Sequence, residues 1–124
     1  MRIQRFEDVI AWQKAKNLTV KIRSTFAGTK DFSFRDQIFR ASLSVMNNIA
    51  EGFDRGTDKE LGYFLIVARG STAEVRSMLI VAAECKYVPA AEQRELLDLT
   101  TEISKILTGF IKAVAVDQRL KTGD

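Results

Sequence analysis

The 124-residue sequence contains no histidine, one cysteine and one proline. Without histidine, the chain cannot form the Glu-x-x-His pairs of di-iron carboxylate bundles, and it lacks the imidazole that activates serine or cysteine nucleophiles. The G-x-x-x-x-G-K-[ST] phosphate loop is also absent from the sequence. We therefore expect a non-enzymatic protein with no catalytic residues, no metal site and no cofactor.

The single cysteine, Cys85, cannot form an intramolecular disulfide, and no paired-cysteine zinc spacing is present. A reducing cytoplasm is therefore the simplest compartment for the protein. Because Cys85 ends the apolar run 81–85, we expect a buried core thiol rather than a reactive one.

Long apolar segments are also missing. The first eight residues are charged where a secretory signal would be continuously apolar. The most apolar runs, 64–68 and 78–83, are far shorter than the roughly 20 residues that cross a bilayer. The sequence therefore predicts neither export nor a membrane partner.

Positive charge is concentrated near the start of the chain. The whole sequence carries 19 basic and 16 acidic residues, for a net charge of +3. Residues 1–30 contain seven basic and two acidic residues, so this segment is more basic than the remainder. In a helix, Lys14 and Lys21 would share one row, and Lys16 and Arg23 a second row. These rows either follow the phosphates of a nucleic acid or only keep the helix soluble.

Apolar residues recur at three- and four-residue spacing throughout, and no strand-like alternation competes with this helical period. Sequence signals for helix ends are Gly28 as a left-handed stop, capping boxes at 33–36 and 57–60, and Pro89 in a first turn. Short connections favour antiparallel neighbours, so the sequence predicts an all-α, single-domain, up-down-up-down four-helix bundle. The expected helices cover residues 6–27, 34–55, 58–87 and 90–116, followed by a frayed tail at 117–124.

Each predicted helix has a row of residues that we expect to face the core. In order, these rows are Trp12, Ala15, Thr19, Ile22 and Phe26; Phe39, Leu43, Met46, Ala50 and Phe53; Leu61, Leu65, Ala68, Thr72, Val75, Leu79 and Ala82; and Leu96, Leu99, Ile103, Ile106, Phe110 and Val114. Further apolar residues flank the first and third rows, namely Phe6, Val9, Ile10, Val20, Ile66, Val67, Ile80 and Val81. This excess favours self-association, with a lightly exposed monomer surface as the alternative.

The second predicted helix has a polar face. Its members are Gln37, Arg40, Ser44, Asn47, Asn48, Glu51 and Arg55. We interpret this face as a hydrogen-bonded contact with another helix or subunit, with a solvated surface as the alternative. Catalysis there would have only Glu51 as a base. In the third helix, Gly70 costs roughly 1 kcal/mol relative to alanine, so we expect a neighbouring backbone to approach it closely.

Several segments resemble a bacterial four-helix-bundle family whose founding members are encoded in intervening sequences of 23S ribosomal RNA genes. They are Phe6–Val9, Trp12–Ala15, Gln37–Ser42, Asn48–Gly52 and Phe64–Glu74, the last containing Gly-Ser-x-x-Glu. The resemblance implies a ring-like homopentamer without enzymatic activity. The implied bundle is also similar in architecture to the accessory protein of diversity-generating retroelements, which binds a reverse transcriptase and nucleic acid.

The sequence and this resemblance together favour a homopentameric scaffold that binds RNA or a ribonucleoprotein. Its expected partners are further copies of the same chain, and RNA or a nucleic-acid enzyme. The alternative is a protein–protein interaction module with no nucleic-acid role. The expected nucleic-acid-binding residues are Lys14, Lys16, Lys21, Arg23 and Arg55. The expected structural or interface residues are Trp12, Arg40, Asn48, Glu51, Gly70, Ser71 and Glu74.

Overall fold

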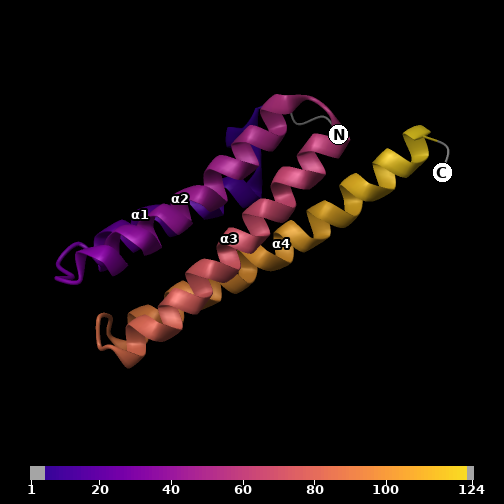
Figure 1. Cartoon of the computed structure of the whole chain (residues 1–124). Coiled ribbons are helices and arrows are strands. Elements are labelled where there is room, and N and C mark those ends of the chain that lie inside the picture. Colours follow the sequence, from indigo (N-terminus) through magenta and orange to yellow (C-terminus); the bar gives the residue numbers. More distant parts are fainter. Residues whose placement is uncertain (1–4, 123–124) are drawn as a thin grey trace.

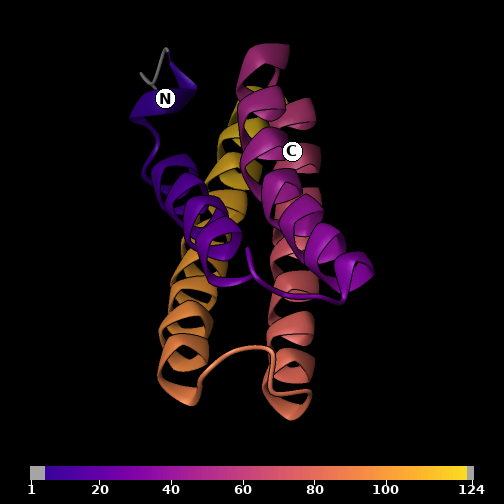
Figure 2. The ribbon, with the colours of Figure 1, turned by 90° about the vertical axis from the view of Figure 1, so that its left-hand side faces the viewer.

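The computed structural model describes residues 5–122, and this part of the chain is helical with no strand. A short 3₁₀ helix is followed by four α-helices: η1 (Phe6–Asp8), α1 (Ile10–Thr25), α2 (Phe32–Arg55), α3 (Asp58–Glu84) and α4 (Ala90–Thr122). α1 packs against α2 and α4, and α3 also packs against α2 and α4 (Figures 1 and 2). Successive helices run in opposite directions, which confirms the antiparallel four-helix bundle.

The core is one continuous cluster of buried apolar side chains contributed by all four α-helices. On α3, the predicted core row is confirmed at all seven positions, from Leu61 to Ala82. No α-helix between residues 5 and 122 is both long and apolar enough to cross a membrane.

The core-facing row of α2 differs from the predicted row. The buried residues are Ile38, Ala41, Ser42, Val45, Ile49 and Gly52. The predicted residues Phe39, Leu43, Met46, Ala50 and Phe53 are half-buried at the flanks. Both faces are apolar, and the buried one also carries the small residues Ala41, Ser42 and Gly52, which let a neighbouring helix approach closely. The large aromatic side chains instead cover the edges of the core.

The first predicted helix, 6–27, is interrupted at Val9. η1 ends at Asp8, and Val9 is extended, with φ −81° and ψ 123°. This bend turns the Val9 side chain into the core, where it is 2% exposed, so its assignment to an apolar flank was wrong. α1 ends at Thr25, and Gly28 does not have the positive φ expected of a left-handed stop.

α2 begins at Phe32, two residues earlier than predicted. The cap is Asp31, whose carboxylate accepts a hydrogen bond from the Phe34 backbone N–H at 3.1 Å. The predicted box at 33–36 is therefore wrong, because Asp31 already occupies the capping position. At α3 the predicted box is confirmed: Thr57 Oγ1 accepts from the Glu60 backbone N–H at 3.2 Å and lies 3.0 Å from Glu60 Oε1.

The connection between α3 and α4 corrects three further predictions. α3 ends at Glu84 rather than near residue 87, and Lys86 has a left-handed φ of 62°. Cys85 lies where the chain leaves the helix, so its thiol is exposed rather than buried in the core. Pro89 precedes α4 instead of lying in its first turn. The Pro89 carbonyl accepts a hydrogen bond from the Gln93 backbone N–H at 3.0 Å.

α4 continues to Thr122, so the frayed tail predicted from residue 117 is wrong up to that point. Lys121 Nζ lies 2.7 Å from Asp58 Oδ2 at the start of α3, and this ion pair holds the last turn of α4. Residues 123 and 124 of the predicted tail lie outside the described range.

Candidate nucleic-acid interface

The two predicted basic rows of α1 have different surroundings. Lys14 forms an ion pair with Glu102, and Lys21 forms one with Glu95, both on α4. Because α4 runs antiparallel to α1, two glutamates seven residues apart meet two lysines seven residues apart. The charge of this row is compensated within the bundle.

The second row, Lys16 and Arg23, is exposed and has no acidic partner among residues 5–122. Lys16 Nζ lies 5.8 Å from the centroid of the Trp12 ring, and Arg23 Cζ lies 5.1 Å from that of Phe39. Aromatic faces attract and orient such cations without neutralising them. These two residues form the uncompensated row.

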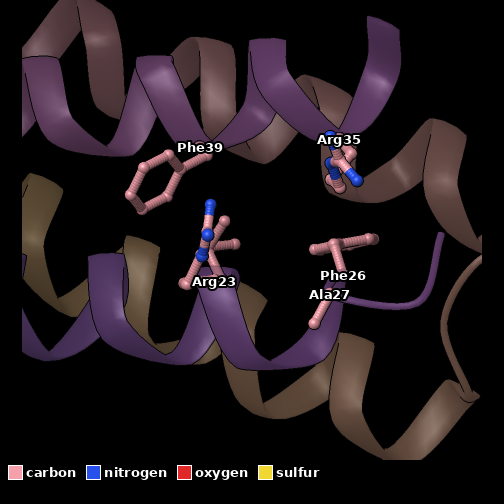
Figure 3. A pocket seen from close by; sticks show the side chains of 6 residues that line it. Arg23, Phe26, Ala27, Arg35 and Phe39 are labelled. Carbon is pink, nitrogen blue, oxygen red and sulfur yellow. The ribbon is translucent and has the colours of Figure 1, made fainter. Parts of the chain in front are cut away.

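Arg23 also lines a cleft between α1 and α2. The cavity has a volume of about 140 Å³, and Figure 3 shows Arg23 from α1 and Arg35 from α2 at its two sides. Its lining residues are Ile22, Arg23, Phe26, Ala27, Arg35 and Phe39. No carboxylate lines the cavity, so its polar side chains are two guanidinium groups. We call this cavity the Arg23–Arg35 cleft.

Arg35 was not identified as a site residue from the sequence, because it lies inside the segment interpreted as a capping box. Its Nε donates to Asp36 Oδ1 at 3.1 Å, and its Cζ lies 4.7 Å from the centroid of the Phe32 ring. The terminal nitrogens of Arg35 donate no hydrogen bond to any side chain or carbonyl of the described chain. In the sequence, Arg35 lies one turn before Phe39 and next to Asp36, and neither neighbour distinguishes it as a site residue.

Arg55, the remaining predicted nucleic-acid residue, lies at the other end of α2. Its guanidinium is 2.9 Å from Glu51 Oε1 and 3.6 Å from Glu60 Oε2, and it lies over the Phe64 ring. The rise of 1.5 Å per residue places it about 24 Å along the helix from Phe39. The structure therefore does not bring Arg55 together with the uncompensated row.

The polar face of α2 meets α3 in a line of hydrogen bonds that we call the α2–α3 polar seam. Gln37 Nε2 donates to Glu74 Oε2 at 2.8 Å, and Ser44 Oγ lies 2.8 Å from Ser71 Oγ. Asn48 Nδ2 donates to the Ser44 carbonyl at 2.8 Å and to Ser44 Oγ at 3.0 Å. Ser71 and Glu74 thus take part in the contact between α2 and α3, whereas both hydrogen bonds of Asn48 stay within α2, where they bind Ser44.

Two other predicted structural residues of this face do not reach α3. Arg40 is exposed and has no hydrogen bond or ion pair within residues 5–122. Glu51 pairs with Arg55 on its own helix, as neighbours four residues apart do. Trp12, from α1, is half-buried and packs edge-on against Phe6 at 5.1 Å between ring centroids.

The expected close approach at Gly70 is not found among the described residues: a Cβ at this position would meet nothing within 4 Å. The tight position is Gly52, where a Cβ would lie 3.0 Å from Phe64 Cβ and 3.1 Å from Leu61 Cδ1. Gly52 therefore sets the closest packing of α2 on α3. The available signal for this close packing was that Gly52 lies in one helical row with Ile38 and Ile49. The predicted core row of α2 was displaced from this buried row by one residue.

A polar contact between α3 and α4 was not predicted from the sequence. Arg76, half-buried on α3, donates to Thr101 Oγ1 at 2.6 Å, Thr100 Oγ1 at 3.1 Å and the Leu97 carbonyl at 3.2 Å. Two helical turns earlier on α3, Arg69 donates to Thr108 Oγ1 at 3.4 Å. The seven-residue spacing of the two arginines was the available signal.

Comparison with known proteins agrees with this architecture. No curated protein matches the chain. A solved structure of a protein of unknown function, from the S23 ribosomal protein family of Bacteroides thetaiotaomicron, superposes with a TM-score of 0.79 at 22% identity. The match covers 83% of this chain and 99% of that one. A sequence model of the 23S rRNA-intervening sequence proteins matches residues 7–109, and the chain therefore belongs to this family.

Proposed function

We propose that the protein is a non-enzymatic homopentameric scaffold that binds RNA, or a ribonucleoprotein, through the uncompensated row of α1. The observation that carries the proposal is the difference between the two basic rows. Lys14 and Lys21 already have carboxylate partners on α4, whereas Lys16 and Arg23 have none among the described residues. A polyanion gains most from charges that no internal partner neutralises.

A pentamer strengthens such a surface by repeating it. Two contacts per chain give weak binding, but five copies arranged in a ring raise the number of phosphate contacts without new chemistry. Each contact with a single strand contributes close to −0.7 to the slope of log affinity against log salt. The slope therefore counts the contacts that the assembly makes.

Exposed apolar side chains on α3 support the self-association. Tyr63, Ile66 and Ile80 are 62%, 49% and 51% exposed, and they share one helical row with Gly70 and Ala73. We call these five residues the α3 apolar row. Ser77 lies on the same row between Ala73 and Ile80. Exposed apolar side chains gathered on one helix face mark an interaction site more often than scattered ones do. It would also serve the alternative function, a protein–protein interaction module.

RNA binding is tested by two matched double variants. Lys16→Gln with Arg23→Gln should weaken binding to unrelated single strands and make the salt slope shallower. Lys14→Gln with Lys21→Gln removes the same charge from the compensated row and should change both quantities less. Fluorescence anisotropy across a salt series measures both. If the wild type shows no salt-sensitive binding to RNA at low ionic strength, the interaction-module function replaces the RNA function.

Self-association is tested by size exclusion coupled to light scattering. The wild type should have about five times the chain mass of 14.0 kDa. Ile66→Glu with Ile80→Glu places charges on the α3 apolar row and should reduce this mass, whereas Val116→Glu, an equally exposed site on α4, should not. A wild-type monomer at micromolar concentration would contradict the pentamer.

A further inference from the structure

We propose that the Arg23–Arg35 cleft binds a terminal phosphate monoester of an RNA strand. This inference rests on the proposed RNA function, and adds to it a chemical end group and a second arginine. The cleft places two guanidinium groups from different helices around one cavity, with only apolar side chains as its other lining (Figure 3). Such an arrangement of like charges is most stable when an anion lies between them.

Both guanidinium groups retain hydrogen-bond donors for an anion. An arginine has five N–H donors, and Arg23 commits none of them within residues 5–122. Arg35 commits only its Nε, to Asp36 Oδ1, so its two terminal nitrogens remain available. Planar guanidinium groups bind phosphate oxygens through paired hydrogen bonds, which lysine does not reproduce.

An aromatic ring lies against each guanidinium group, Phe39 in the wall of the cleft and Phe32 outside its lining. The Phe39 ring lies 5.1 Å from Arg23 Cζ, and the Phe32 ring lies 4.7 Å from Arg35 Cζ. Phe26, which is 1% exposed, contributes to the wall of the cavity. Side chains oriented before binding lose less entropy when the ligand arrives.

The size of the cleft selects an end group rather than a whole nucleotide. Its volume of about 140 Å³ is well below the roughly 300–1,000 Å³ of pockets that enclose drug-sized ligands. It is also more enclosed than the other four cavities described in residues 5–122. The strand continues on both sides of an internal phosphodiester, so it would have to leave the cavity in two directions. A terminal phosphate is attached to the strand on one side only.

Charge favours the same ligand. A phosphate monoester carries about −1.5 to −2 at neutral pH, and the cleft offers it two guanidinium groups, of which Arg35 also forms an ion pair with Asp36. A phosphodiester carries only one negative charge. RNA is the favoured source because Arg23 belongs both to the cleft and to the uncompensated row, which leads along α1 to Lys16.

The test compares one RNA sequence of ten nucleotides in three forms: with a 5′-phosphate, with a 3′-phosphate, and with hydroxyl groups at both ends. Each form competes against a labelled strand in fluorescence anisotropy at one fixed salt concentration. Wild-type protein should prefer at least one phosphorylated form by about tenfold, the effect of one added charge-assisted hydrogen-bond pair. Equal affinity for all three forms would overturn the proposal.

Variants assign the preference to the cleft. Arg35→Gln should abolish it while leaving affinity for the hydroxyl form within about twofold, because Arg35 lies outside the uncompensated row. Arg35→Lys keeps the charge without the planar fork and should retain only part of the preference, and thermal melts verify that both variants are folded. Arg55→Gln, which removes a compensated arginine elsewhere on α2, should retain the preference in full. A preference that survives Arg35→Gln would overturn the assignment to this cleft.

Two further arms separate this inference from the RNA function on which it rests. Lys16→Gln should weaken all three RNA forms equally and leave their ratio unchanged. Inorganic phosphate and a phosphoserine peptide serve as competitors of the phosphorylated strand. If these bind the cleft while no RNA form binds the protein, the RNA-end assignment is overturned together with the proposed function. If RNA binds without an end preference, only the cleft proposal fails.

Discussion

The hydroxyl groups of Ser44 on α2 and Ser71 on α3 lie 2.8 Å apart and share a hydrogen bond across the helix interface. Ser44 also accepts from Asn48 through its backbone carbonyl and its hydroxyl. The Gly-Ser-x-x-Glu segment is therefore positioned by α2, with Ser71 and Glu74 both bonded across the α2–α3 polar seam. This part of the motif has a structural role within the chain.

Ser44→Ala and Ser71→Ala should each lower the free energy of unfolding by about 1 kcal/mol, because each leaves a partly buried partner without its bond. The double variant should cost less than the sum of the two single variants, since both remove the same interaction. Urea denaturation of the four proteins measures the coupling. Fully additive losses would show that the two hydroxyls do not interact in solution.

Gly52→Ala should lower the free energy of unfolding by about 1–3 kcal/mol, because its Cβ would lie 3.0 Å from Phe64 Cβ and force α2 and α3 apart. Gly109→Ala on α4 is the matched control. A Cβ there meets nothing within 4 Å, so it should stabilise the helix by roughly 0.5–1 kcal/mol. The same sign for both variants in thermal or urea unfolding would contradict the close contact at Gly52.

The Tyr87 hydroxyl donates to Asp31 Oδ2 at 2.8 Å and links the α3–α4 connection to the start of α2. The Phe34 backbone N–H, and after it the Tyr87 hydroxyl, lower the pKa of Asp31 below its ordinary 3.8. The bond to Asp31 is also the main cause that raises the pKa of Tyr87 above 10.0. A lowered carboxyl pKa gives stability that is present above the unfolded pKa and lost as pH falls through the folded pKa.

Asp31→Asn keeps an acceptor for the helix cap but removes the titrating charge. Its melting temperature should fall less than that of the wild type as the solution is acidified below about pH 4. Tyr87→Phe should remove part of the alkaline dependence, since a raised tyrosine pKa stabilises the fold only until pH rises through it. Parallel acid profiles of the wild type and Asp31→Asn would exclude a lowered Asp31 pKa.

Arg40→Ala should change the free energy of unfolding of the folded chain by no more than about 0.5 kcal/mol, because Arg40 has no partner among the described residues. Gln37→Ala on the same face is the comparison, and should cost about 1 kcal/mol by breaking the bond to Glu74. Both are measured by urea unfolding and light scattering. A larger loss for Arg40→Ala, with a smaller particle, would place Arg40 between subunits.

The core row of α3 was predictable because its apolar residues form one clear row behind a capping box at Thr57. The row of α2 was not, because Ile38 and Phe39, or Val45 and Met46, are equally apolar neighbours on adjacent faces. Which face is buried depends on how closely α1 and α3 can approach. Gly52 sets this distance on the side of α3, and such tertiary packing is a property that helical periodicity does not encode.

The candidate site shows the same limit. The two basic rows of α1 were both visible in the sequence, but nothing local distinguishes Lys14 and Lys21 from Lys16 and Arg23. Glu95 and Glu102 decide which row is compensated, and they act only through the antiparallel register of α4. Arg35 joined the site for a similar reason, because the α1–α2 packing brings it to the same cavity as Arg23.

The ion pairs between α1 and α4 have a consequence for how the chain folds. Lys21 and Glu95 are 74 residues apart in sequence, whereas the α1–α2, α2–α3 and α3–α4 interfaces each join consecutive helices. Contacts between consecutive helices form early because they close short loops, and distant contacts pay a greater loss of chain entropy. We therefore expect the contacts between consecutive helices to form first, and the docking of α1 on α4 to be the closing step that completes the bundle.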